Sequence, residues 1–543
     1  MPASPVVIAS KPGIKRDGTK FEGDYYVDGQ WVRFQRGLPR KIGGYRAISS
    51  YLNQISRGMK TYTEDGFTYV HSGSSENLER FTLDQNANAS AVADRTPITL
   101  NYSSNNAWQF DVLYDSINLV PSNKIIAQVA QNLDSLYNSF GGQLFVGDLR
   151  ATDRLVEVTV PSGVSASGGV CVLHPYLTVF GTDGSLGWSA PGDPTSLSGI
   201  GSGNARIAAQ KIVRGLPLRG GPGNAPAGLF WSADAVIRAS YVGGSQTFQF
   251  DTISSQSSIL SPNSVIEYDG IYLWCGVDRF LMFNGVVRDI PNDLNINYFF
   301  DGLNREYSQK VFAFKVPRFG EIWWCYPRGS ATECTHAVIF NIREQTWYDT
   351  QLPNDGRSAG EFATQFATPL LTGVKVNENK LPPVIRETQA GDIRVTEAGD
   401  IRIIYSSDNY KFWQHETGVN EIDINTLNAI QSYFETADIS DLIMQGKNKS
   451  LRCELLEPDF VQSENMSVQI VGRANARAKE IAGEVKTIVP NPSTPFEQVI
   501  FFKEIRREMR FRFESNIING DYQMGQVIAH IEEADGTVLG ATN

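Results

Sequence analysis

Short apolar segments separated by glycine-containing turns recur along this chain. Residues 269–285 read D-G-I-Y-L-W-C-G-V-D-R-F-L-M-F-N-G, in which an Asp-Gly turn, an apolar run, a second turn, another apolar run and an Asn-Gly pair follow one another. The same order appears across residues 65–83 and again across residues 320–348. Turns of this kind between apolar runs are typical of antiparallel hairpins. Degenerate copies of one hairpin, with no long helix between them, predict an all-β fold whose small sheets form a radial array, a β-propeller.

The chain divides into three predicted parts. We expect residues 1–60 to form an N-terminal arm or platform segment, residues 61–425 a β-propeller with loop insertions, and residues 426–543 a C-terminal β-sandwich (platform) domain. A length of 543 residues exceeds one ordinary core, but a propeller can grow because each blade buries its face on its neighbours. In the last part, four segments alternate apolar and polar residues as sandwich strands do. They are residues 451–455, 467–471, 498–502 and 509–513.

Cysteine usage and hydropathy indicate a protein folded in a reducing compartment and outside membranes. The five cysteines are an odd set, mostly in apolar contexts and without C-x-x-C spacing, which predicts reduced core thiols made in a cytosol. No apolar run approaches the ~20 residues of a membrane span, and the first residues lack the basic start of a signal peptide. We expect neither membrane insertion nor export by a signal peptide.

The charge balance limits how the protein can interact with nucleic acid. The chain has 48 Lys plus Arg and 59 Asp plus Glu, which gives a formal net charge of −11. Affinity for duplex DNA comes largely from cationic neutralisation of phosphates, so we do not expect tight DNA binding. An acidic protein can still surround DNA, because a wall that repels the duplex lets it slide.

No group of residues has the spacing of a catalytic or metal site. The five histidines include no pair at i, i+4, and neither H-E-x-x-H nor the nucleophile elbow G-x-S-x-G occurs. Residues 406–413, S-S-D-N-Y-K-F-W, resemble the turn-stabilising aspartate box of sialidase-type propellers, with Tyr410 where that box has Gly. We predict no enzyme activity, no cofactor, and no catalytic or metal-binding residues. Paired carboxylates for glycoside hydrolysis stay an alternative, because their separation is a property of the fold.

Two basic stretches in this acidic chain are the candidate interface sites. The first, W-V-R-F-Q-R-G-L-P-R, contains Trp31, Arg33 and Arg40, and the second, R-R-E-M-R-F-R-F, contains Arg510 and Arg512 on alternate positions of a strand. A ring of identical subunits needs two unlike patches, and Arg and Trp are enriched at interface hot spots. We predict that these patches meet acidic surface on a neighbouring copy or an adaptor. The alternative is a leading strand pair and a solvated strand edge.

A series of ordered short motifs resembles the tail hub or nozzle proteins of short-tailed phages, also called packaged-DNA stabilisation proteins. The likeness covers most of residues 23–515, and residues 85–160 match poorly. The motifs include L-P-L-R-G-G at 216–221, G-L-F-W-S at 228–232, I-E-Y-D-G at 266–270, F-G-E-I-W-W at 319–324 and W-Y-D at 347–349.

The resemblance implies a structural protein of the phage tail, assembled in the host cytoplasm. Six copies would form a ring below the portal and adaptor proteins, with the genomic double-stranded DNA in a central channel and tail fibres or a needle docked outside. Acidic residues facing the channel would keep DNA from sticking, and loops would narrow the exit, so that the nozzle retains packaged DNA and passes it during ejection. The alternatives are a sialidase-like propeller that hydrolyses glycans and a propeller that only binds glycans, as an adhesin.

Overall fold

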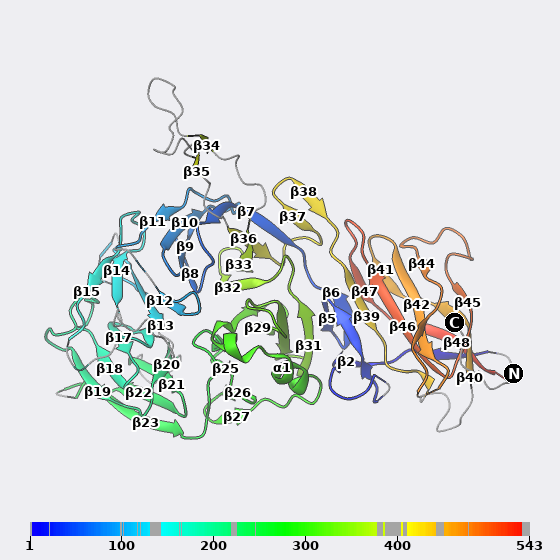
Figure 1. Ribbon diagram of the computed structural model, residues 1–543, viewed down its shortest axis with the longest axis horizontal. Coiled ribbons are helices and arrows are strands. Elements are labelled where there is room, and N and C mark those ends of the chain that lie inside the picture. Colours follow the sequence, from blue (N-terminus) through cyan, green and yellow to red (C-terminus); the bar gives the residue numbers. More distant parts are fainter. Residues whose placement is uncertain are drawn as a thin grey trace, which may run out of the picture.

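The computed structural model of the chain describes residues 3–534 except 21, 98–99, 101, 117, 120, 131–142, 162, 164–165, 219–224, 245, 377–383, 386–402, 405–409, 441–449 and 476. This described part contains forty-eight strands, one α-helix and one 3-10 helix, which confirms the predicted all-β class. Figure 1 shows two regions, which we call the ring (residues 45–428) and the body, whose sheets combine strands from both ends of the chain. No helix in the described residues is long and apolar enough to cross a membrane.

Six sheets of the ring are four-stranded and antiparallel, and in each the strands follow one another in sequence. The first three are β8 (Met59–Glu64), β9 (Phe67–Gly73), β10 (Leu78–Leu83) and β11 (Ala93–Asp94); β12 (Ala107–Leu113), β13 (Lys124–Ala130), β14 (Leu144–Asp148) and β15 (Val156–Val158); and β16 (Gly169–Leu173), β17 (Tyr176–Phe180), β18 (Ser185–Trp188) and β19 (Gly203–Arg206). The next three are β20 (Ile212–Pro217), β21 (Ala227–Ser232), β22 (Val236–Tyr241) and β23 (Phe248–Ser254); β24 (Ile266–Tyr268), β25 (Ile271–Cys275), β26 (Phe280–Phe283) and β27 (Val287–Asp289); and β28 (Phe312–Val316), β29 (Glu321–Tyr326), β30 (His336–Asn341) and β31 (Thr346–Gln351).

The seventh sheet joins strands from the two ends of the ring sequence. Its order is β32 (Arg357–Ala363), β33 (Thr368–Val376), β36 (Tyr410–His415), β7 (Tyr45–Leu52), β37 (Glu421–Asp423) and β38 (Thr426–Asn428). A separate pair is formed by β34 (Val384–Ile385) and β35 (Ile403–Ile404). Because β7 precedes the first sheet in the chain and pairs antiparallel with β36, the seventh sheet ties the beginning of the ring to its end. Residues 406–409 of the aspartate-box resemblance lie outside the described residues.

The sheets pack side by side around a common centre. Their first strands contact one another in order: β8 on β12, β12 on β16, β16 on β20, β24 on β28, β28 on β32, and β32 back on β8. The fourth and fifth sheets meet through Trp231 and Trp274, whose ring centroids lie 5.6 Å apart. The helices α1 (Ile296–Gly302) and η2 (Arg305–Lys310) link the fifth sheet to the sixth, and Phe299 of α1 is buried against Tyr326.

Tight turns set the hairpins of the ring. Asp65 and Gly66 have φ values of 50° and 79°, and Asp269 and Gly270 have 49° and 80°. Two consecutive positive φ values define a type I′ turn, whose twist matches that of the flanking strands and which Asp-Gly adopts at little cost. The predicted hairpins that follow these two turns are confirmed as β9–β10 and β25–β26. The predicted strand over residues 336–342 is confirmed as β30.

The body combines both ends of the chain in three sheets and one parallel pair. The sheets are β1 (Ser4–Val7), β48 (Ile528–Ala534), β40 (Ser450–Glu457) and β45 (Ile500–Arg506); β4 (Asp28–Gln30), β39 (Ser432–Glu435), β46 (Glu508–Ser515), β42 (Met466–Arg473) and β43 (Ile481–Ala482), with β44 (Lys486–Ile488) on β42; and β41 (Phe460–Gln462), β47 (Tyr522–Met524), β6 (Leu38–Lys41) and β5 (Val32–Gln35). The parallel pair is β2 (Lys11–Ile14) with β3 (Tyr25–Tyr26). The four strands predicted from alternation in the C-terminal part lie in β40, β42, β45 and β46.

The N-terminal strands lie between the ring and the remainder of the body, as Figure 1 shows for β2, β5 and β6. One continuous apolar core runs through the ring, the N-terminal strands and the remainder of the body. Trp31 and Phe34 come from the N-terminal segment, Trp323 and Tyr348 from the sixth sheet of the ring, and Phe513 from the body. The N-terminal segment therefore joins ring and body into one packed unit, because removing it would expose core side chains on both sides.

Candidate functional site

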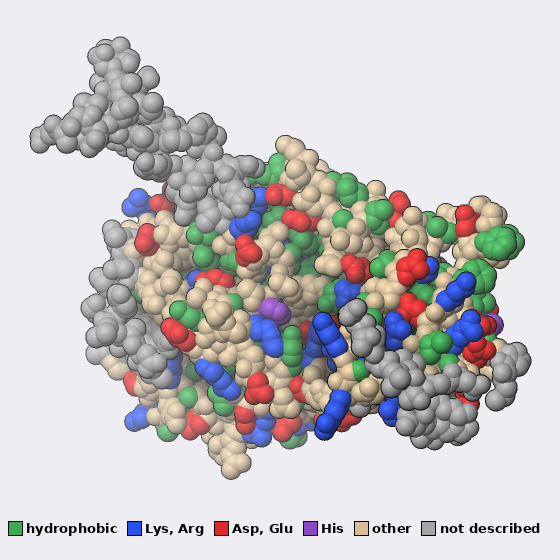
Figure 2. Space-filling view, turned by 45° about the vertical axis from the view of Figure 1, so that its right-hand side comes forward, with side chains coloured by type: hydrophobic (Ala, Val, Ile, Leu, Met, Phe, Trp, Pro, Cys, Tyr) green, Lys and Arg blue, Asp and Glu red, His purple; other side chains and the backbone are tan. Residues whose placement is uncertain are grey.

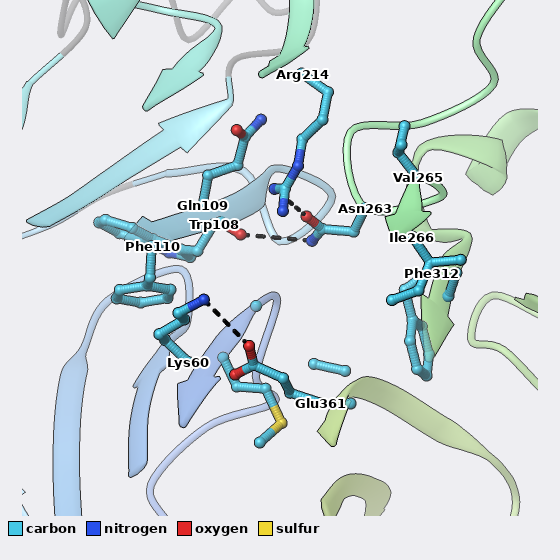
Figure 3. Close-up of a pocket in the computed structure, with 15 residues that line it drawn as sticks. Lys60, Trp108, Gln109, Phe110, Arg214, Asn263, Val265, Ile266, Phe312 and Glu361 are labelled. Carbon is cyan, nitrogen blue, oxygen red and sulfur yellow. Dashed lines mark hydrogen bonds and ion pairs between the residues drawn. The ribbon is translucent and has the colours of Figure 1, made fainter. Parts of the chain in front are cut away.

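A cavity of about 100 Å³ lies at the centre of the ring (Figure 3). Its lining includes Lys60 on β8, Gln109 on β12, Arg214 on β20, Asn263 before β24, and Glu361 on β32. All but Asn263 come from first strands, which is why side chains far apart in the sequence meet here. The cavity has room for a few waters and none for a nucleic acid duplex.

Charges around this cavity are balanced. The Nζ of Lys60 lies 3.3 Å from Glu361 Oε1 and 4.0 Å from Asp111 Oδ1, and these carboxylates raise the pKa of Lys60. Arg214 donates from Nη1 to the Asn263 Oδ1 at 3.2 Å, and burial lowers the pKa of Arg214. Two cations and two carboxylates share the centre, so the site has no net charge to concentrate an ion. Polar and charged side chains therefore meet at the centre of the ring.

Burial disfavours the charged forms of three histidines and two cysteines. Desolvation lowers the pKa of His71 and of His415 well below the usual histidine range, and lowers the pKa of His336 to about 4. Burial likewise raises the pKa of the thiols of Cys275 and Cys325 well above the usual value. Across the described ranges, no group of three or more His, Cys, Asp or Glu is arranged to hold a metal ion.

Trp31 and Arg33, two of the predicted interface residues, are buried inside the chain. The indole Nε1 of Trp31 donates to the Gly43 carbonyl at 3.1 Å, and its side chain is 1% exposed. Arg33 on β5 is also 1% exposed. Both residues therefore contact the chain's own ring, and the expectation of an exposed basic arm is wrong for them. The physical reason is that the N-terminal segment completes the core between ring and body.

Arg33 is the centre of a buried ion-pair cluster. It donates from Nε to Glu321 Oε1 at 2.7 Å and from Nη1 to Glu416 Oε2 at 2.9 Å, while its guanidinium lies 3.7 Å from the ring centroid of Phe319. Burial alone would lower the pKa of Arg33, but the two carboxylates raise it overall. Burial raises the pKa of Glu321 despite its contact with Arg33. The cluster connects β5 with the sixth sheet and with the residue that follows β36.

Arg510 and Arg512 lie on β46, which is an interior strand of its sheet between β39 and β42. Arg510 is fully buried, with Nη2 3.1 Å from Glu480 Oε1 and 3.7 Å from Glu435 Oε2. The side chain of Arg512 is 23% exposed and lies 3.2 Å from Glu435 Oε1. The expectation of an exposed, strongly basic strand face is therefore wrong for Arg510, because neighbouring strands supply acidic partners.

Arg40 on β6 is half-buried and donates from Nη1 to Gln35 Oε1 at 2.8 Å. Of the five predicted interface residues, only Arg40 and Arg512 keep exposed side-chain surface. Trp31, Arg33 and Arg40 lie near one another on one segment, whereas Arg510 and Arg512 belong to a different sheet. A role of any of them in contact with another chain stays a prediction.

The acidic partners of these arginines, Glu321, Glu416 and Glu435, were missed from the sequence. For Glu321 a signal exists, because a single charged residue opens the otherwise apolar strand E-I-W-W-C-Y. A carboxylate that must enter a buried strand needs a cation, and Arg33 is the one that reaches it. The sequence around Glu416 and Glu435 gives no sign of their ion pairs, because their arginine partners lie far away in the sequence.

Comparison with known proteins does not assign a family. The chain matches no protein-family model, and no curated protein sequence matches it.

Proposed function

We propose that the protein is a structural virion protein that forms the tail nozzle, or hub, of a short-tailed phage. The observation that carries the proposal is a ring of seven small sheets joined through the N-terminal segment to a body of three sheets. We interpret the ring as a seven-bladed β-propeller and the body as a β-sandwich platform. Motifs that resemble nozzle proteins fall in the ring: residues 228–232 in β21, residues 266–270 in β24 and its turn, and residues 319–324 at the start of β29. A rigid unit of this kind suits a part that must withstand the pressure of packaged DNA.

In the proposed nozzle, DNA passes between copies of the chain, arranged as a homohexamer. The cavity at the centre of the ring in each copy is about 100 Å³, which is too small for DNA. The conduit would therefore lie between the copies. The net charge of −11 supports passage without tight binding. Figure 2 shows Lys and Arg side chains interspersed with Asp and Glu on the visible face, without one continuous basic surface. The portal and adaptor proteins would contact one end of the assembly, and fibres or a needle its outside.

Assembly is the direct test. Purified protein, alone and mixed with portal–adaptor complexes, would be examined by mass photometry and negative-stain electron microscopy. We expect rings of six copies, or copies that cap the ends of portal–adaptor complexes. Protein that stays monomeric and does not join portal–adaptor complexes would contradict it. An assay for released reducing sugar or sialic acid on the same preparation tests the sialidase-like alternative, and we expect no release above background.

A further inference from the structure

A second cleft, of about 540 Å³, lies between the ring and the body. Its lining comes from Gln30 on β4, from Gln351 at the end of β31, from the turn at residues 353–356, from Lys375 on β33, and from the segment 429–433 that enters β39. The volume is within the range of small-molecule binding sites, and the position, where two packed regions meet, is a common one for them.

The rim of the cleft holds polar side chains that the fold does not use. Gln30 exchanges hydrogen bonds with the backbone of Gln351, at 3.0 Å to its carbonyl and 2.9 Å from its amide, and this fixes the rim. Within the described chain, the exposed side chains of Gln351 and Asp355 make no hydrogen bond. An amide and a carboxylate together offer donors and acceptors, as a ligand with several hydroxyl groups requires.

Asp355 is held on the rim by a tight turn. Asn354 and Asp355 have φ values of 53° and 62°, and the Gly356 amide closes the turn by donating to the Pro353 carbonyl at 3.2 Å. The Asn354 amide donates from Nδ2 to Glu421 Oε1 at 3.1 Å, which anchors the turn to β37. Asn and Asp tolerate positive φ, so the position of the carboxylate is fixed without a large strain.

The aromatic wall of the cleft is Tyr433. The guanidinium of Arg512 lies 3.6 Å from the centroid of its ring, and Arg512 is itself held by Glu435 and Glu514. Arg512 packs on this ring, and Tyr433 lines the cleft. In the part of the chain that the structure describes, the Tyr433 hydroxyl makes no hydrogen bond. A rigid aromatic face next to unused polar groups is an amphipathic surface.

We propose that this cleft binds a neutral saccharide. The C–H face of a sugar ring would pack on Tyr433, and its hydroxyl groups would bond to Asp355 and Gln351. A phosphate or nucleic acid requires a surplus of cations, whereas the described lining contains Asp355 as well as Lys375. A lipid chain requires continuous apolar walls, whereas the lining of this cleft includes four amide side chains and two charged ones. Saccharide binding does not depend on the assembly of several copies, and it is a function beyond the proposed nozzle role.

The test is titration of the full-length protein, by calorimetry and saturation-transfer NMR, with maltotriose, lactose and the N-acetylglucosamine trimer, each up to about 10 mM. Inorganic phosphate serves as the comparison ligand. We expect at least one saccharide to bind with a Kd on the order of 1 mM or below. Tyr433→Ala and Asp355→Gly should each weaken binding about tenfold or more, and Gly keeps the positive φ at position 355. Tyr241→Ala, at an exposed tyrosine on β22, is the matched control and should bind as wild type.

Three results would overturn the proposal: no binding of any saccharide, equal binding by wild type and the cleft variants, or phosphate that competes with the sugar. If Tyr433→Ala does not fold by circular dichroism, Asp355→Gly and Gln351→Ala decide, because both positions are exposed. Electron microscopy of the same variants separates this proposal from the nozzle proposal. Variants that assemble as wild type does but no longer bind the sugar support saccharide binding in the cleft, whatever the result for the nozzle proposal.

Discussion

The ring and the body consist of similar short strands but draw them from the chain in different ways. In six ring sheets each strand pairs with the next one in sequence, as in β24 to β27 within residues 266–289. In the body, Ser4 pairs with Ile531 and Gly29 with Phe434, so the two ends of the chain meet. Local pairing costs little loop-closure entropy, whereas the body can form only after almost the whole chain has been placed. The six consecutive sheets of the ring are therefore specified by residues close in sequence, whereas the body depends on residues from both ends of the chain.

The largest expected effect comes from removing residues 1–44. This deletion removes β1 to β6, so each sheet of the body loses at least one strand. We expect β39 to β48 to lose protection in hydrogen-exchange mass spectrometry, because three sheets lose strands and the shared core opens. The strands β20 to β26 should stay protected, since their partners are all within the ring. Deletion of residues 1–7 alone is the control, because it removes only the edge strand β1. Full protection of β39 to β48 in the longer deletion would show that the body folds without the N-terminal segment.

The second prediction concerns the ion pair between the N-terminal segment and the ring. Arg33→Met leaves the carboxylates of Glu321 and Glu416 buried without their cation, so we expect a loss of about 3 to 5 kcal/mol in the free energy of unfolding. Chemical denaturation measures the loss. The double variant Arg33→Met with Glu321→Gln should recover part of it, because one uncompensated charge is removed. A loss below about 1 kcal/mol for Arg33→Met would mean that packing alone joins ring and body.

The third prediction uses a buried carboxyl inside the ring. Burial raises the pKa of Glu79 on β10 from its usual value near 4.5 to about 7, and no cation in the described residues forms an ion pair with it. Between these pH values the folded state holds a proton that the unfolded state releases, so the stabilising contribution is full below about pH 4.5 and is lost as pH rises through about 7. The free energy of unfolding, measured from about pH 5 to 8, should fall by about 1 to 3 kcal/mol more in wild type than in Glu79→Gln. Parallel curves would contradict the shift.

The sequence predicts well those ring sheets whose strands are consecutive in the chain. Asp65-Gly66 and Asp269-Gly270 mark hairpins because their positive φ values are a property of the residues themselves. The alternation in residues 509–513 likewise predicts β46, but it does not predict that Glu435 and Glu480 lie beside Arg510. Those partners come from strands whose place in the sheet depends on the whole fold. For the same reason the cleft between ring and body has no signal in the sequence, since its lining comes from five separate segments.

The smallest effect on stability is expected for the two predicted interface arginines that keep exposed surface, Arg40 and Arg512. Each contributes about 0 to 1 kcal/mol, because the ion pairs of Arg512 are partly exposed and screened by solvent, and Arg40 donates a half-exposed hydrogen bond to Gln35. Arg510→Ser should cost more, about 1 to 3 kcal/mol, since it removes a buried cation from beside the buried carboxylate of Glu435. A loss of assembly in Arg510→Ser would therefore follow from misfolding as easily as from a lost contact. Arg40→Ser combined with Arg512→Ser keeps the fold and removes only surface charge. If this double variant still joins portal–adaptor complexes as wild type does in mass photometry, neither basic stretch contacts a neighbour, and the contact surface of the proposed hexamer lies on the sheets of the ring.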